Sequence, residues 1–129
     1  TKIASGGELS RISLAIQVAT IGYSTIPTLI FDEVDVGIGG GVAEIVGSLL
    51  RQLGEQRQIL CVTHLPQVAA QAHNHLRVEK ESGDDGSWTS ITPLDEEKRV
   101  VEIARMLGGV ELTQTTLDHA REMILKTAS

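Results

Sequence analysis

The stretch "TLIFDEVDVGIGGGVAEIVGSLLRQLGEQRQILCVTH", Thr28 to His64, decides the fold. It opens with an apolar run, "TLIFDE" (28–33), which is typical of a short buried strand and stops at two carboxylates. From Gly41 to Leu53 the apolar residues recur on one helical face, and Gly54 ends the helix. "QILCVTH" (58–64) is a second apolar strand. This order predicts a βαβ unit with a right-handed crossover, and therefore two parallel strands in a sheet that is buried on both faces.

Polar residues follow both predicted strands. Ligands of open α/β sheets bind outside the carboxyl ends of the strands, and there we expect Asp32, Glu33 and His64 to gather. An aspartate that holds a hydrated magnesium ion, next to a glutamate that deprotonates an attacking water, is one interpretation. A strand that meets solvent with two charges, followed by a packed or solvated histidine, is the other. Asp35 in "DEVDVG" is compatible with a simple turn.

The N-terminal stretch "ASGGELS" raises a similar choice. Ser5 and Glu8 have the S-x-x-E spacing of a capping box, in which both side chains satisfy backbone N–H groups of a first helical turn. Capping leaves Gly6 and Gly7 unexplained, because glycine costs roughly 1 kcal/mol relative to alanine inside a helix. Residues without side chains at a helix N-terminus also let a phosphate approach the N–H groups there.

The remaining elements are expected in an order that completes an α/β chain. Apolar residues at helical spacing predict a helix after the two glycines, which Gly22 and Pro27 end: Leu9, Ile12, Ala15, Ile16 and Ala19. Beyond His64 we expect a short helix over 66–72, strands over 75–81 and 87–94, and helices over 95–107 and 113–126. The turn "SGDDG" joins the two later strands.

Bulk properties exclude several classes of protein. With 129 residues and 41% hydrophobic content, the chain is expected to be one domain or part of one. Its net charge of -6 argues against a basic nucleic-acid surface on this piece. The sole cysteine, Cys61, cannot form an intrachain disulfide, which fits a reducing cytoplasm. We see no signal peptide and no membrane-spanning run, and because the chain starts at Thr1 we expect a fragment.

Three other motifs are rejected on spacing or context. "GIGGG" (37–41) fails as a dinucleotide loop because the third glycine of G-x-G-x-x-G would fall at Val42, so we interpret it as a loop and helix entry. "HNH" (73–75) supplies no metal geometry by itself. A hydrolase triad of Ser5, His64 and Asp32 lacks the G-x-S-x-G elbow.

The conjunction of motifs resembles the C-terminal half of an ABC-type ATPase head, in its SMC-like branch. "SGGEL" is similar to the signature motif, "TLIFDE" to Walker B, "VDVG" to the D-loop and "VTH" to the switch histidine. "KIASGGELSR", "FDEVDVGIGGGVAEIVG", "CVTHLPQVAAQAHNH" and "RVVEIARMLGG" resemble a bacterial DNA repair member of this branch more narrowly, over essentially the whole chain. The resemblance implies a P-loop NTPase fold, with a mainly parallel sheet flanked by helices, and one head domain to which all of residues 1–129 belong.

The resemblance also implies roles for individual residues. Asp32 would help to bind Mg²⁺, Glu33 would be the general base for ATP hydrolysis, and His64 would contact the γ-phosphate. Asp35 would communicate across the interface between two heads. The signature residues would bind ATP held by the second head: Ser5, Gly6, Gly7 and Glu8.

One departure from the family is large. The loop G-x-x-x-x-G-K-[ST] is absent, since none of the four lysines follows a glycine: Lys2, Lys80, Lys98 and Lys126. In the family this loop belongs to the N-terminal half of the head, so we predict negligible ATPase activity for this chain alone. The implied partners are that N-terminal half, a second head in a homodimer, and DNA through the complete protein, in the bacterial cytoplasm near the nucleoid. The alternative is a non-catalytic interaction module that keeps an ATPase-like half fold.

Overall fold

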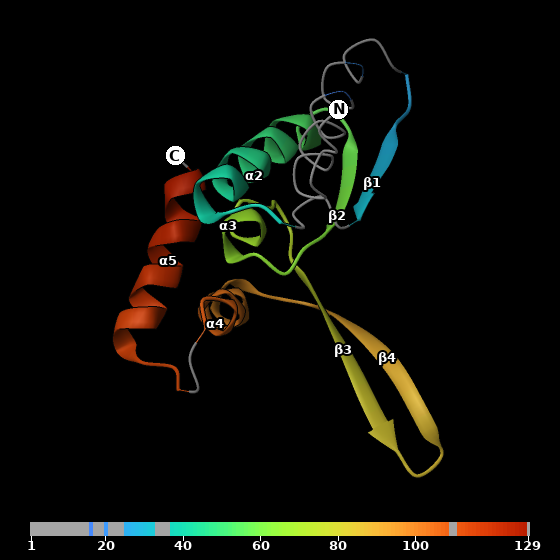
Figure 1. Ribbon diagram of the computed structural model, residues 1–129, viewed down its shortest axis with the longest axis vertical. Coiled ribbons are helices and arrows are strands. Elements are labelled where there is room, and N and C mark those ends of the chain that lie inside the picture. The colour runs from blue at the N-terminus through green and yellow to red at the C-terminus, as the bar shows by residue number, and fades with distance from the viewer. Residues whose placement is uncertain (1–15, 17–19, 21–24, 33–36, 109–110, 129) are drawn as a thin grey trace, which may run out of the picture. The chain divides into compact units, whose positions relative to one another are not determined.

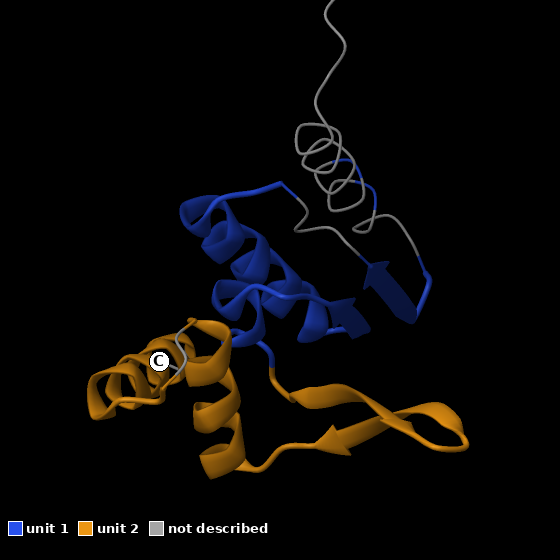
Figure 2. Ribbon diagram, turned by 60° about the horizontal axis from the view of Figure 1, so that its bottom comes forward, with its two compact units in different colours: residues 1–72 blue, residues 73–129 orange. Residues whose placement is uncertain are grey.

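The computed structural model describes residues 16, 20, 25–32, 37–108 and 111–128. The chain divides into two compact units, residues 1–72 (unit 1) and residues 73–129 (unit 2), which Figure 2 colours separately. That both belong to one head domain stays a prediction.

Unit 1 contains the predicted βαβ arrangement. Strand β1 (Thr28–Asp32) is followed by helix α2 (Gly40–Gly54), strand β2 (Gln58–Val62) and the short helix α3 (Pro66–Ala69). The strands pair in parallel, with Thr28 opposite Gln58 and Asp32 opposite Val62 (Figure 1). The parallel βαβ prediction is confirmed, and the glycine stretch is the predicted helix entry, because Gly39 is the N-cap of α2.

The core of unit 1 lies between one face of this sheet and α2. Phe31 of β1 is buried, and the apolar face of α2 covers it with Val46 and Leu50. Alternate residues of both strands pack against the same cluster: Leu29, Ile59 and Cys61. The period-2 alternation of the strands thus places half of their side chains toward α2.

The opposite face of the sheet corrects one expectation. Ile30 is 71% exposed, Leu60 43% and Val62 60%, although two buried faces were predicted. The helix between two parallel strands covers one face only, and a second covering layer must come from other segments. The prediction of two buried faces is therefore wrong for β1 and β2 as they stand in this chain.

Unit 2 pairs a hairpin with two helices. Strand β3 (Leu76–Gly83) and strand β4 (Gly86–Pro93) are antiparallel, and helices α4 (Glu96–Met106) and α5 (Gln114–Ala128) follow them. Gly86 closes the hairpin with φ of 121°, a left-handed conformation that favours glycine. Asp95 caps α4 by accepting a hydrogen bond of 2.8 Å from the Lys98 backbone N–H. These elements confirm the predicted ones, with boundaries that differ by a residue or two.

The core of unit 2 is small and helical. Helices α4 and α5 pack together, and their buried apolar residues are Val100, Ile103, Ala104 and Ala120. Ile103 is completely inaccessible to solvent. Most of the hairpin stays exposed, including Trp88 and the apolar residues Val78 and Ile91.

Candidate functional site

The topology of unit 1 brings two of the predicted site residues to one edge of the sheet. Asp32 is the last residue of β1 and lies opposite Val62, the last residue of β2. His64 comes two residues after Val62, so both polar side chains follow the carboxyl ends of paired parallel strands. Both residues are exposed, as ligand-binding groups at a sheet edge must be.

The other predicted site residues lie outside the described residues. Glu33 follows Asp32 directly in the chain, and Asp35 follows two residues later. The signature residues are also outside: Ser5, Gly6, Gly7 and Glu8. The roles suggested for these six residues remain predictions.

His64 sits in a turn that its neighbours close. The Thr63 hydroxyl oxygen accepts a hydrogen bond of 3.0 Å from the Leu65 backbone N–H, which bridges the residue between them. The Leu65 carbonyl then accepts hydrogen bonds of 3.1 Å from Val68 and from Ala69, which start α3. This turn ends β2 at Val62 rather than at His64, where the sequence had suggested the strand would stop.

A buried glutamine ties the segment after His64 to helix α2. Gln71 is 8% exposed, and its side-chain amide nitrogen donates a hydrogen bond of 2.6 Å to the Glu44 carbonyl oxygen. In return, Arg51 Nη1 donates to the Gln71 carbonyl oxygen at 2.7 Å. Sequence reasoning missed this contact. The available signal was a glutamine within the otherwise apolar "VAAQA", where an unpaired side-chain amide would be costly to bury.

The described residues fit a magnesium ion only in a limited sense. They contain no group of three or more His, Cys, Asp or Glu side chains placed to hold a metal ion. Asp32, at the end of β1, is the described carboxylate that would help to hold a magnesium ion whose other ligands are water and substrate phosphates.

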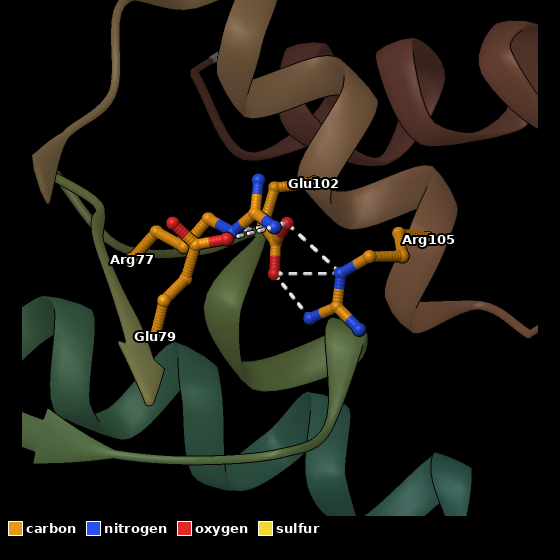
Figure 3. Close-up of polar contacts among 4 residues, drawn as sticks. All are labelled: Arg77, Glu79, Glu102 and Arg105. Carbon is orange, nitrogen blue, oxygen red and sulfur yellow. Dashed lines mark hydrogen bonds and ion pairs between the residues drawn. The ribbon is translucent and has the colours of Figure 1, made fainter. Parts of the chain in front are cut away.

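A second polar cluster lies in unit 2, and sequence reasoning missed it too. Figure 3 shows Glu102 of α4 between two guanidinium groups, Arg105 on the same helix and Arg77 of β3, with Glu79 beside Arg77. The hydrogen bond from Arg105 holds the pKa of the Glu102 carboxyl below its ordinary value, with smaller contributions from the charges of both arginines. These contacts join the hairpin to α4 and give this cluster a structural role.

His75 stands at the start of the hairpin beside this cluster. Burial lowers the pKa of its imidazole, the nearby Arg99 charge lowers it further, and Glu102 acts in the opposite direction. Its Nδ1 atom is buried without a hydrogen-bond partner. The neutral form of His75 is thus favoured in the folded chain.

Similarity to known proteins now gives this arrangement its context. No family model matches the chain. It is 60% identical over 123 residues, 95% of its length, to the DNA repair protein RecN of Haemophilus influenzae. The RecN proteins of Bacillus subtilis and Deinococcus radiodurans are 44% and 47% identical over 96% and 95% of the chain. In sequence, the chain is similar to one part of RecN. It spans only about a fifth of the length of these RecN relatives.

A solved structure shows the fold. The chain is similar, with a TM-score of 0.66 and 22% sequence identity, to a protein from a study of ATP-driven dimerization and DNA-stimulated activation of SMC ATPases. The match covers 84% of this chain and 65% of that one. The predicted α/β fold of an SMC-like ATPase is confirmed, as is the resemblance to RecN that the motifs indicated. At this level of identity the structural likeness carries the fold alone.

Among the residues described here, none of the helices is both long enough and apolar enough to cross a lipid bilayer.

Proposed function

We propose that this chain is the C-terminal half of the ATPase head of a RecN-like DNA repair protein, which hydrolyses ATP when the head is complete. The observation that carries the proposal is the shared sheet edge: Asp32 and His64 follow the carboxyl ends of two parallel strands. The similarity to RecN and the fold of an SMC ATPase support it. One fold can host many functions, so the residues at the sheet edge decide between them.

Three residues have distinct parts in the proposed reaction. Asp32 would help to hold a magnesium ion, Glu33 would accept a proton from the attacking water, and His64 would contact the γ-phosphate. Bound with ATP, magnesium would supply positive charge against the developing negative charge of the phosphates. Phosphoryl transfer requires mainly positioning and electrostatic stabilisation, and polar side chains on rigid strand ends provide both.

Other partners complete the proposed site. Ser5, Gly6, Gly7 and Glu8 would contact ATP bound to a second head, since bare N–H groups at a helix N-terminus favour phosphate. Asp35 would communicate across the interface between the two heads. The N-terminal half of the head would supply the phosphate loop, so this chain alone is expected to have negligible ATPase activity.

The complete protein is proposed to engage DNA in the bacterial cytoplasm, near the nucleoid. DNA contacts would come mainly from other parts of the protein, because the net charge of this chain is -6. ATP-driven association of two heads would then open or close the assembly around DNA.

Replacement of the proposed base tests this function. In the complete protein, Glu33→Gln keeps the size of the side chain and removes its ability to accept a proton. We expect phosphate release to fall by at least about a hundredfold, while ATP still causes head dimerisation measured by light scattering. Normal ATP turnover in Glu33→Gln would show that another residue is the general base. A complete protein that neither hydrolyses ATP nor dimerises with it would favour the non-catalytic interaction module.

A further inference from the structure

We propose that Gln71 is a positioning residue for His64: it fastens the segment 63–70 to helix α2 and so fixes where the histidine stands. The inference rests on the proposed function for the role of His64. It concerns unit 1 alone, in which α3 lies beside α2 (Figure 1). The contact is made by the side chain of one residue and the backbone of another, and no catalytic group takes part.

The first step is the closeness of the contact on the α2 side. Gln71 Nε2 lies 2.6 Å from the Glu44 carbonyl oxygen, within the α2 backbone. Gly47 lies one turn further along α2 and lets α3 approach. A Cβ atom on Gly47 would lie 2.9 Å from Gln71 Nε2, 3.1 Å from the Gln67 carbonyl oxygen and 3.2 Å from the Val68 Cα. Two of these three neighbours are backbone atoms, which would have to move by a few tenths of an ångström to accept a side chain at 47, and the Gln71 amide would have to shift as well.

The second step is that the contact is buried and paired on both sides. Gln71 is 8% exposed, so its amide is removed from competing water. Besides the bond to Glu44, Arg51 donates to the Gln71 carbonyl oxygen at 2.7 Å. Helix α2 therefore holds residue 71 through its side chain and through its backbone. Loss of a buried hydrogen-bond donor that is paired in this way costs on the order of a fivefold change in local equilibrium.

The third step links residue 71 to the histidine. Helix α3 starts with hydrogen bonds from Val68 and Ala69 to the Leu65 carbonyl, and the Leu65 N–H donates to the Thr63 hydroxyl. His64 is thus the middle residue of a closed turn between a strand end and a helix fastened to α2. A shift of α3 would move the turn, because no unbonded stretch lies between them to absorb the change.

Hydrogen exchange in the complete protein tests the anchoring directly. Gln71→Leu replaces the polar side chain by an apolar one of similar size and so removes the amide, and Gly47→Ala disturbs the same contact from α2. The control is Gly41→Ala, on the same helix, where an added Cβ would meet nothing within 4 Å. We expect backbone amides of 63–70 to exchange at least about fivefold faster in both test variants and not in the control. Unchanged exchange in both test variants would overturn the proposal.

Kinetics then test the link to His64. With ATP as substrate, Gln71→Leu should lower kcat about five- to tenfold and leave KM within about twofold, as expected when only transition-state positioning is lost. In a His64→Ala background the same change should cause no further loss, because there is no histidine left to position. A full additional loss in that background would overturn the positioning role. If the complete wild-type protein hydrolyses no ATP, the proposed function fails, and the exchange data alone decide whether Gln71 holds the turn.

Discussion

Replacement of Glu102 by glutamine should weaken unit 2 measurably, although the chain is rich in exposed acidic residues. The Glu102 side chain is 6% exposed, and Arg105 Nε donates to its two carboxylate oxygens at 3.1 and 3.0 Å. Arg105 Nη2 adds a further bond, and Arg77 Nε lies 3.5 Å from Oε2. Glu102→Gln preserves the shape of the side chain, removes its charge and replaces one acceptor by a donor that faces a guanidinium.

The size of the effect follows from these contacts. Removal of one partner of a buried ion pair costs about 3 to 5 kcal/mol when both groups are buried. The Arg105 side chain is 59% exposed, so water screens the interaction and can solvate the guanidinium in the variant. One amide oxygen also remains as an acceptor. We therefore expect the free energy of unfolding to fall by about 1 to 2 kcal/mol.

Urea unfolding followed by tryptophan fluorescence measures this change. Trp88 is the sole tryptophan of the chain and lies in β4, so it reports on unit 2. With a slope of roughly 1 to 3 kcal/mol/M, the midpoint should fall by about 0.3 to 2 M. The matched control is Glu97→Gln on the same helix, whose side chain is 86% exposed and 4.0 Å from Arg121. Equal midpoints for the two variants would refute the reasoning.

The effect of pH on the difference in stability between the wild type and Glu102→Gln provides a second, independent test. Because the pKa of Glu102 is lowered in the folded chain, chiefly by the Arg105 hydrogen bond, its stabilisation is present above the ordinary glutamate value. It is lost as the pH falls through the lowered value, where the folded state also takes up the proton. The midpoint difference between the wild type and Glu102→Gln should therefore shrink toward acid. A difference that grows toward acid would contradict the assignment.

Two further predictions concern other buried groups. Phe31 is 4% exposed and Ile30 is 71% exposed. Phe31→Ala should therefore lower the free energy of unfolding by about 3 to 5 kcal/mol and Ile30→Ser by under about 1 kcal/mol, as measured by thermal melting. Similar losses in the two variants would contradict the observation that only one face of the sheet is buried. Burial and the Arg99 charge lower the pKa of His75 from 6.5, so the stability of unit 2 should fall as the pH drops below about 6.5. The fall should be smaller in His75→Gln than in the wild type. If the urea midpoint falls equally in both proteins between about pH 7.5 and 5.5, the prediction is wrong.

Periodicity predicted most of the fold because the fold follows from local patterns. Short apolar runs predicted β1 and β2, apolar residues at helical spacing between glycines predicted α2, and the helical connection predicted that the strands are parallel. The wrong expectation concerned the second face of the sheet. Ile30, Leu60 and Val62 look in sequence like residues of a fully buried strand, and a strand pattern does not reveal which segment covers it.

Some features of the polar sites follow from the topology of the chain, and others follow only from side-chain packing. Topology alone placed Asp32 and His64 at one edge, because parallel strands end together. The glutamine in "VAAQA" signals a buried polar contact, but its partner could not be predicted, since that partner is a backbone carbonyl 27 residues earlier in the chain and α3 is too short to show a helical period. Glu102 looked like one charge among many in "EEKRVVEIARM", and only the packed structure reveals that it is buried.

Variants of exposed and of packed residues should therefore affect catalysis and stability differently. Asp32 and His64 are exposed, so replacing either should leave the unfolding midpoint nearly unchanged while the activity of the complete protein falls. Gln71 and Gly47 are part of the packing between α2 and α3, so replacing them should change both. Hydrogen exchange at residues 63–70 rises only when the packing changes. A variant that loses turnover without faster hydrogen exchange has therefore lost a function of the edge residues themselves. A variant that loses turnover and exchanges faster has lost the packing that holds this segment in place.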